Sequence, residues 1–191
     1  MDKLWAPWRS TYITKIVKGT KGCIFCRMYR QKKDKENFIF LRKTHSYAVL
    51  NLYPYNNGHV LIVSNRHVND LDKLTKNEKE DLINLLEEAK ALLTKMIKPS
   101  GYNVGINLGR VAGAGFPGHL HIHLVPRWKG DVNFMPVVAD TKIMSQSLRV
   151  VFTQLSHEYK KRHRGIRREN PCSLRDEEQR FRGQGARQFS A

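Results

Sequence analysis

The sequence predicts an α+β fold in which a mostly antiparallel sheet of about five strands packs against two main helices on one of its faces. Two observations carry this prediction. Five short stretches are rich in β-branched and aromatic residues and are bounded by turn formers, which is typical of strands. Two longer stretches repeat apolar residues at the spacing of an amphipathic helix. With 191 residues, the chain is long enough for one domain with a substantial core.

Three strands are expected in the first third of the chain. Residues 37–42 and 46–52 are the first two, and a short turn joins them. A segment rich in Pro, Asn and Gly then leads into a third strand over residues 59–64. The preceding residues 1–36 show no sustained periodicity, so we expect an irregular N-terminal segment.

Two helices follow from the spacing of apolar residues. Thr75 is a suitable N-cap and Glu78 stands three residues further on, so the pair predicts a capping box. A leucine stripe continues from there at helical spacing until Pro99 and Gly101 end the helix. A second helix is expected over residues 142–161, where apolar residues again share one face.

The last two strands enclose a glycine-rich segment. Residues 102–108 form the fourth strand, and a loop over residues 109–118 connects it to a fifth strand that begins at His119. Because these strands follow one another almost directly, we expect them to pair antiparallel. The domain is expected to span residues 1–162, and the basic residues 163–191, which include few apolar side chains, are expected to form a mobile tail.

The formal net charge of +17 indicates a surface that attracts polyanions, whether nucleic acids or charged nucleotides. The basic residues are spread along the chain, so the charge alone does not favour a dedicated nucleic-acid interface. No apolar run approaches the roughly 20 residues that span a bilayer. The first residues also lack the apolar core of a signal peptide. We therefore expect a cytoplasmic protein without a membrane partner.

Three histidines, His119, His121 and His123, alternate with apolar residues and are the most informative feature of the chain. On a strand they would share one face, with neighbouring imidazoles roughly 7 Å apart, while the apolar residues face the core. A neutral imidazole can attack phosphorus when one ring nitrogen is bare and the other donates its proton to a fixed acceptor. The glycine-rich segment before the strand offers backbone N–H groups to phosphate oxygens.

Cys23 and Cys26 form a Cys-x-x-Cys pair. In a cytosolic protein such a pair indicates metal or redox chemistry more often than a structural disulfide. Two thiolates on a tight turn are half of a tetrahedral zinc site. The alternatives are a reduced, metal-free pair and a redox-active pair, although no thioredoxin-like pattern surrounds these cysteines.

The alternating histidines resemble the motif of the histidine triad (HIT) family of nucleotidyl hydrolases and transferases. The Gly-His of residues 58–59, with its preceding strand, and the Asn-x-Gly of residues 107–109 are also similar to the family pattern. The resemblance covers residues 3–160 and implies the family's fold. Three stretches resemble the branch that contains diadenosine tetraphosphate phosphorylases and hydrolases, namely residues 5–9, 51–56 and 126–136.

The resemblance implies a role for each site residue. His121 would be the nucleophile that takes a nucleoside monophosphate from the α-phosphorus, and His123 would contact the phosphate and help to protonate the leaving group. In zinc-containing relatives, two histidines complete the Cys-x-x-Cys site, and His67 and His119 stand at those positions. Substrate contacts would come from Asn51 at the ribose, from His59 in the same pocket and from Asn107 near the phosphates. Gly115 and Phe116 stand where the family often has Ser or Gln, and they would also contact the substrate.

The implied activity is cleavage of a dinucleoside polyphosphate, such as diadenosine tetraphosphate, with water or phosphate as acceptor. The zinc would be structural, and no catalytic metal is required because pocket donors and the basic surface would offset the developing charge. Hydrolysis of nucleoside phosphoramidates is a second reading. A zinc-stabilised nucleic-acid-binding protein is a third, which would bind with a steep salt dependence. A homodimer is expected because family members commonly dimerise.

Overall fold

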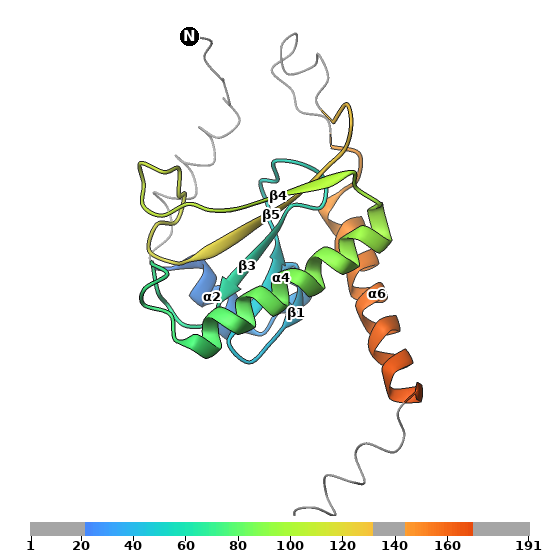
Figure 1. The fold of residues 1–191 in the computed structure, drawn as a ribbon, viewed down its shortest axis with the longest axis horizontal. Coiled ribbons are helices and arrows are strands. Elements are labelled where there is room, and N and C mark those ends of the chain that lie inside the picture. The colour runs from blue at the N-terminus through green and yellow to red at the C-terminus, as the bar shows by residue number, and fades with distance from the viewer. Residues whose placement is uncertain (1–21, 132–143, 170–191) are drawn as a thin grey trace, which may run out of the picture. The chain divides into compact units, whose positions relative to one another are not determined.

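The computed structural model describes residues 22–131 and 144–169, with side chains as far as residue 162. In these residues the chain forms a sheet with strand order β1-β2-β3-β5-β4, and every neighbouring pair is antiparallel (Figure 1). The strands are β1 Ile39–Arg42, β2 Ser46–Leu50, β3 Val60–Ser64, β4 Gly101–Ile106 and β5 His121–Arg127. The helices are α2 Ile24–Gln31, α3 Asp34–Asn37, α4 Lys76–Ile97 and α6 Leu148–Glu169. The predicted α+β fold is confirmed.

Strand β5 lies between β3 and β4, although β4 precedes it in the chain. His121 is therefore opposite Val63 of β3, and His123 is opposite Leu61 of β3 and Gly105 of β4. The histidine strand has a hydrogen-bonded neighbour on each side, which fixes its register. The predicted antiparallel pairing of the last two strands is confirmed.

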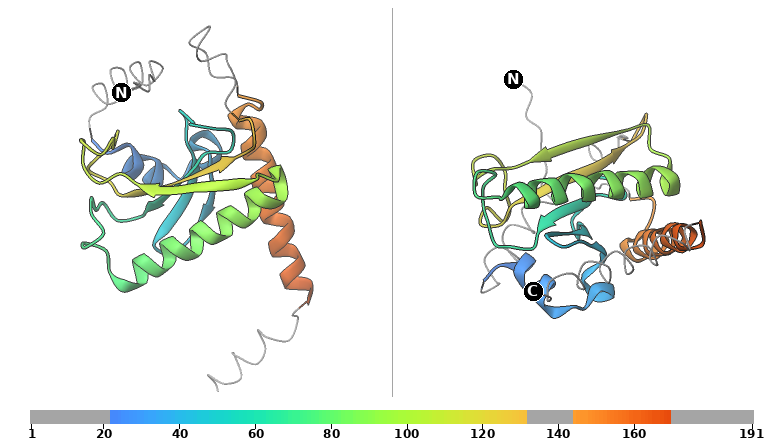
Figure 2. Two further views of the ribbon diagram at one scale, coloured as in Figure 1. Left: turned by 45° about the horizontal axis from the view of Figure 1, so that its top comes forward. Right: turned by 60° about the horizontal axis from the view of Figure 1, so that its bottom comes forward.

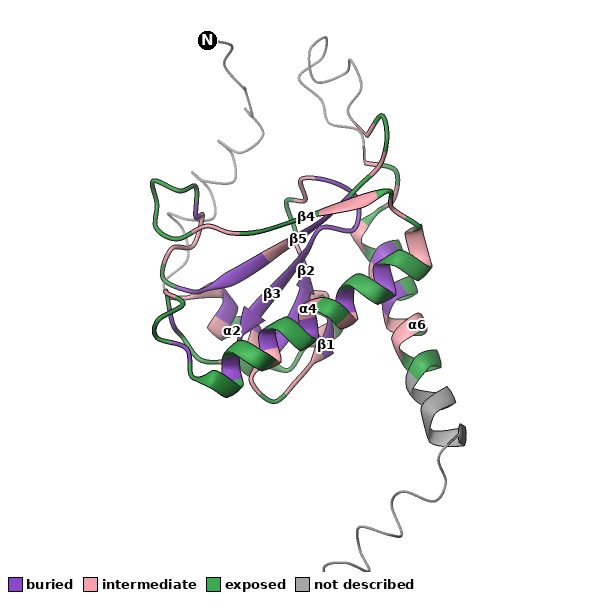
Figure 3. Ribbon diagram, viewed as in Figure 1, coloured by how far each residue is buried: buried purple, intermediate pink, exposed green. Residues whose placement is uncertain are grey.

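The two faces of the sheet are covered by different helices. Ser46 donates a hydrogen bond to the Asp81 carboxylate of α4, which places α4 on the face of Ser46 and its alternate neighbours. Tyr47 and Val63 belong instead to an apolar cluster that includes Phe25 of α2. Because both faces are covered, every residue of β2 and β3 is buried (Figures 2 and 3).

Helices α2 and α3 lie in the segment that the sequence predicted as irregular, and α2 is on the face opposite α4. The expectation that the helices pack on one face is therefore wrong for α2. Its buried residues, Phe25 and Met28, are three positions apart and give it one apolar side. An eight-residue helix offers too few apolar positions for the periodicity on which sequence-based prediction depends. Residues 1–21 lie outside the described part of the chain.

The two long helices match their predictions to different degrees. Thr75 caps α4 and forms the expected capping box with Glu78. Helix α6 begins at Leu148 rather than at residue 142, and it continues to Glu169, beyond the predicted domain end at residue 162. Ser156 ends one compact unit and His157 begins the next. The predicted tail beyond Glu169 lies outside the described residues. None of the described helices is long and apolar enough to cross a membrane.

Glu78 also joins α4 to the segment after β3 through a salt bridge with Arg66, at 2.7 Å. The hydrogen bonds from Arg66 hold the pKa of Glu78 at about 2, below its ordinary value of 4.5. Because the pKa is lower in the folded chain, this stabilisation is present above pH 4.5 and is lost as the pH falls towards 2. We expect Glu78→Gln to lower the free energy of unfolding by about 1 kcal/mol at pH 7.

Urea unfolding at a series of pH values measures this effect. The stability of Glu78→Gln should fall less between pH 5 and pH 2 than that of the parent protein. The exposed Glu80 on the same helix provides a matched control, Glu80→Gln, which should keep the parent's pH dependence. A Glu78→Gln protein whose stability falls as steeply as the parent's would contradict the assignment.

Candidate active site and metal centre

The His121 imidazole is held in one tautomer by its own strand. Its Nδ1 lies 2.8 Å from the backbone carbonyl oxygen of His119. A carbonyl oxygen only accepts hydrogen bonds, so Nδ1 carries the hydrogen and Nε2 keeps its lone pair in the neutral ring. The residue is 7% exposed, and burial lowers the pKa of His121. These are the conditions that a nucleophilic imidazole requires.

His123 is paired with His59 of the Gly-His segment. His59 Nε2 lies 3.0 Å from His123 Nδ1, and the backbone N–H of Tyr55 donates to His59 Nδ1 over 3.0 Å. Since His59 Nδ1 accepts, a neutral His59 carries its hydrogen on Nε2 and donates it to His123. A neutral His123 then carries its own hydrogen on Nε2.

The rings of His121 and His123 are closer together than the strand rise suggests. Their centroids are 5.0 Å apart with an interplanar angle of 64°, against the roughly 7 Å predicted from two residue rises. The two side chains therefore lean towards each other. The ring of His121, with a bare Nε2, and the ring of His123, with a protonated Nε2, are neighbours on one face of the sheet.

An apolar hollow of about 410 Å³, including its open mouth, lies on this face beside Asn51. The Asn51 amide nitrogen is 3.3 Å from His59 Nδ1, which places this predicted substrate residue next to the histidine pair. Gly58 precedes His59 with φ of +73°, and a Cβ atom there would lie 2.8 Å from Ile97 Cδ1. The positive φ favours glycine at this position. The hollow is lined by Ile24, Phe25, Met28, Val49, Leu50, Asn51, Leu52, Tyr53, Leu61 and Phe116.

The glycine-rich loop contributes one of its predicted residues to this hollow. Phe116 lines it and contacts the Phe25 ring edge-on, with centroids 5.7 Å apart, and the half-buried Gly115 directly precedes it. The Asn107 amide nitrogen lies 3.5 Å from the carbonyl oxygen of Gly113. Within the described residues Asn107 has no hydrogen bond to a histidine, so its predicted phosphate contact stays a prediction.

The sequence did not predict the contribution of α2 to this site. Ile24, Phe25 and Met28 form one wall of the hollow, and Phe25 packs against His121 with centroids 5.0 Å apart. The available signal was the i, i+3 spacing of Phe25 and Met28 directly after the first cysteine. The sequence likewise predicted no role in the site for Tyr55, which lies in the turn-rich segment and in the stretch 51–56 that resembles the branch.

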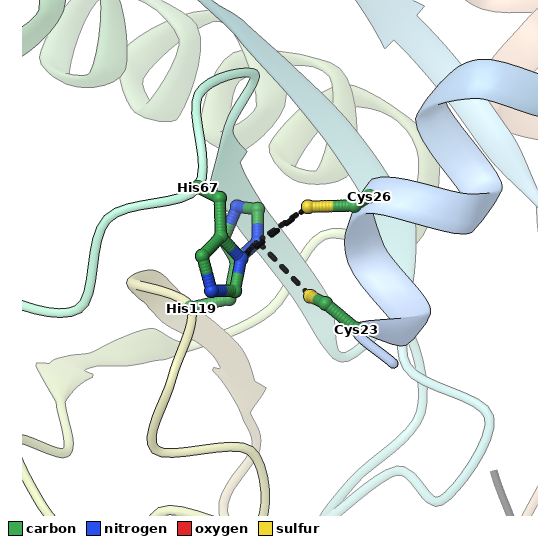
Figure 4. Close-up of side chains that lie close together, drawn as sticks. All are labelled: Cys23, Cys26, His67 and His119. Atoms are coloured by element: carbon green, nitrogen blue, oxygen red, sulfur yellow. Dashed lines mark hydrogen bonds between the residues drawn. The ribbon is translucent and has the colours of Figure 1, made fainter. Parts of the chain in front are cut away.

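The four predicted metal ligands converge beside the triad strand, and their ligand atoms all lie within 4.8 Å of one another (Figure 4). Cys23 and Cys26 come from the start of α2, His67 from the segment after β3, and His119 from the residues just before β5. His119 Nε2 lies 2.8 Å from the Ser64 carbonyl oxygen, which leaves His119 Nδ1 as the atom that faces the thiols.

The separations of these atoms fit a tetrahedral zinc ion. Such an ion would place sulfur and nitrogen ligands about 3.6 Å apart and two nitrogen ligands about 3.4 Å apart. His119 Nδ1 lies 3.2 Å from Cys23 Sγ and 3.5 Å from Cys26 Sγ. His67 Nδ1 lies 3.3 Å from both Cys26 Sγ and His119 Nδ1. Burial raises the pKa of the Cys26 thiol, so a bound cation would displace its proton.

The HIT domain family matches residues 32–130. The chain belongs to the HIT family. A Mycobacterium tuberculosis protein named AP-4-A phosphorylase is 38% identical over 156 residues, which are 78% of this chain and 80% of that protein. A Schizosaccharomyces pombe protein named bis(5'-nucleosyl)-tetraphosphatase [asymmetrical] is 35% identical over 105 residues, 55% of this chain and 57% of that protein. The resemblance found in the sequence, including its branch, is confirmed.

Solved structures agree on the fold. A Zn-bound histidine triad family protein from Mycobacterium smegmatis has a TM-score of 0.61 and 17% identity, over 75% of this chain and 97% of that chain. The NitFhit protein of Caenorhabditis elegans has a TM-score of 0.52 and 27% identity, over 64% of this chain and 27% of that chain. The chain therefore shares its fold with solved HIT proteins.

Proposed function

We propose that this HIT protein transfers a nucleoside monophosphate from a dinucleoside polyphosphate to water or inorganic phosphate through a covalent intermediate on His121. The observation that carries the proposal is the His121–His119 hydrogen bond, which leaves the His121 Nε2 lone pair on the face that holds the hollow. The names of the relatives, AP-4-A phosphorylase and bis(5'-nucleosyl)-tetraphosphatase, support diadenosine tetraphosphate as the substrate.

The first step forms a bond between His121 Nε2 and the α-phosphorus. The bond from that phosphorus to the bridging oxygen breaks, and the oxygen leaves with the electron pair. His123 Nε2, which holds its hydrogen because His59 donates to His123 Nδ1, donates a hydrogen bond to the leaving oxygen and stabilises its charge, so that the polyphosphate leaves as an anion.

In the second step His121 is the leaving group. An oxygen of water or phosphate attacks the α-phosphorus, the N–P bond breaks, and the proton of an incoming water is released to solvent with the monophosphate product. His121 regains its lone pair, so the enzyme returns to its starting state. The nucleoside end of the substrate would occupy the apolar hollow, with Asn51 at the ribose hydroxyls.

We assign a structural zinc ion to Cys23, Cys26, His67 and His119. The separations of the ligand atoms support this assignment, as does the Zn-bound HIT structure of similar fold. The ion would cross-link α2 to the residues before β5, and thereby hold the wall of the hollow against the histidine strand. A homodimer and a cytoplasmic location stay predictions.

Incubation with diadenosine tetraphosphate, with and without phosphate, tests the reaction. Hydrolysis gives ATP and AMP, whereas phosphorolysis gives ATP and ADP, and anion-exchange chromatography separates the two outcomes. We expect one of these product pairs. Cleavage of adenosine 5'-phosphoramidate but not of diadenosine tetraphosphate would contradict the proposal and favour the hypothesis of a nucleoside phosphoramidate hydrolase. If the protein cleaves neither nucleotide and binds nucleic acid with a steep salt dependence, the hypothesis of a zinc-stabilised nucleic-acid-binding protein is favoured.

A further inference from the structure

We propose that Tyr55 is a positioning residue whose backbone N–H and ring hold the His59–His123 pair in one tautomer and one orientation. This inference rests on the proposed function, because it concerns the hydrogen bond that His123 Nε2 donates to the leaving group. Tyr55 lies outside the triad and outside the metal centre, and it contacts both His59 and His123.

The first part of this clamp is the Tyr55 backbone. Its N–H donates to His59 Nδ1 over 3.0 Å, and the Asn51 amide nitrogen approaches the same atom at 3.3 Å. A ring nitrogen that accepts hydrogen bonds carries no hydrogen of its own. His59 must therefore donate from Nε2 to His123 Nδ1, and the hydrogen of a neutral His123 is left on Nε2.

The second part is the Tyr55 ring. Its centroid lies 4.7 Å from that of His59 with an interplanar angle of 29°, and 5.7 Å from that of His123 with an angle of 23°. One aromatic ring thus stacks on both imidazoles. Rotation of either imidazole would break a stacking contact as well as the 3.0 Å hydrogen bond between them.

The pair needs this clamp because its hydrogen bond can run in either direction. If His59 carried its hydrogen on Nδ1, then His59 Nε2 would accept from His123 Nδ1. A neutral His123 would then present a lone pair at Nε2 and could not donate a hydrogen bond to the leaving group. The Tyr55 N–H opposes this reversed tautomer, because it would meet a hydrogen on His59 Nδ1 instead of a lone pair.

The loop that carries Tyr55 is itself anchored. The side-chain nitrogen of the next residue, Asn56, donates to the Pro126 carbonyl oxygen at 3.0 Å and to the Asp131 carboxylate at 2.7 Å. Asp131 also forms a salt bridge with Arg127 at 2.6 Å. The end of β5 therefore fixes the loop, and the Tyr55 N–H remains directed at His59.

Two substrates that differ in the leaving group separate positioning from a general structural role. The amine of adenosine 5'-phosphoramidate is a poor leaving group that depends on a donor at its nitrogen, whereas the p-nitrophenolate of the AMP p-nitrophenyl ester leaves without such help. We expect Tyr55→Leu to lower kcat on the phosphoramidate at least about 10-fold and to change kcat on the ester less than about 3-fold. Both variants keep the backbone N–H, and Tyr55→Phe, which also keeps the ring, should lose less than Tyr55→Leu on the phosphoramidate.

Nitrogen-15 NMR of the histidine side chains gives a second readout that does not depend on turnover. In the parent protein, Nδ1 of His59 and of His123 should show the shift of a bare nitrogen and Nε2 of each that of a protonated one. In Tyr55→Leu, the His123 shifts should move towards an average of the two tautomers.

Three results would overturn the proposal, namely equal losses on both substrates in Tyr55→Leu, no loss on either, or a parent spectrum with the hydrogen on His59 Nδ1. If Tyr55→Leu does not fold, the parent spectrum alone decides. A parent protein that cleaves no nucleotide would refute the proposed function and would leave the tautomer measurement as the test of the clamp.

Discussion

Replacing His121 by asparagine is expected to reduce kcat on diadenosine tetraphosphate at least about 1000-fold and to leave the fold intact. The asparagine amide can still donate to the His119 carbonyl oxygen, which accepts from His121 Nδ1 in the parent. It has no nucleophilic nitrogen in place of Nε2, so the covalent step is lost. The substitution removes the reacting atom with little change in volume.

Three measurements check this result. Steady-state kinetics give kcat, a thermal melt reports the fold, and mass spectrometry of quenched parent enzyme should find AMP on the peptide that contains His121. The half-buried His45, which lies outside the triad and the metal centre, serves as the matched control, because His45→Asn should keep parental activity. Retention of more than a few per cent of kcat by His121→Asn would falsify the nucleophile assignment.

Loss of the metal centre is the second change with a large expected effect. Substituting both Cys23 and Cys26 by serine should abolish stoichiometric zinc binding and lower Tm by about 10 °C, which corresponds to about 3 kcal/mol for a chain of this size. The affinity for AMP should fall as well, because α2 supplies Ile24, Phe25 and Met28 to the hollow and would lose its cross-link to His119.

Elemental analysis, calorimetric melting and AMP titration measure these three effects. His67→Ala removes an exposed ligand and leaves the triad complete, so it should reproduce the loss of zinc with a smaller loss of AMP affinity. Cys172, outside the described residues, provides the control, since Cys172→Ser should retain zinc. A double cysteine variant that binds one zinc ion per chain would show that the four residues are not its site.

The features that could be predicted from the sequence are those that the spacing of residues within a short segment specifies. Thr75 and Glu78 mark the start of α4 because a capping box is complete within four residues. The alternation through His121 and His123 defines a strand with one chemical face, since the period of a strand is two residues. The bounds of the predicted strands differ from the observed ones by at most two residues at each end.

The parts that it did not predict depend on contacts between distant residues. Phe25 is buried because Tyr47 and Val63 of the sheet lie against it, and no local pattern in a short helix reports that. Tyr55 acquires its position from Asp131, which binds the adjacent Asn56 from the far end of β5. The predicted role of Asn107 came from resemblance alone, and its amide faces the Gly113 carbonyl oxygen.

The place of β5 between β3 and β4 has a consequence for folding. Val63 and His121 are paired across a long stretch of chain that includes all of α4 and β4. Contacts of such sequence separation form late, because the entropy of closing the loop must be overcome before they stabilise the chain. We therefore expect the histidine face to be among the last surfaces to be assembled, and a partly folded chain to lack a competent nucleophile. Nucleotidyl transfer would then report directly on completion of the sheet.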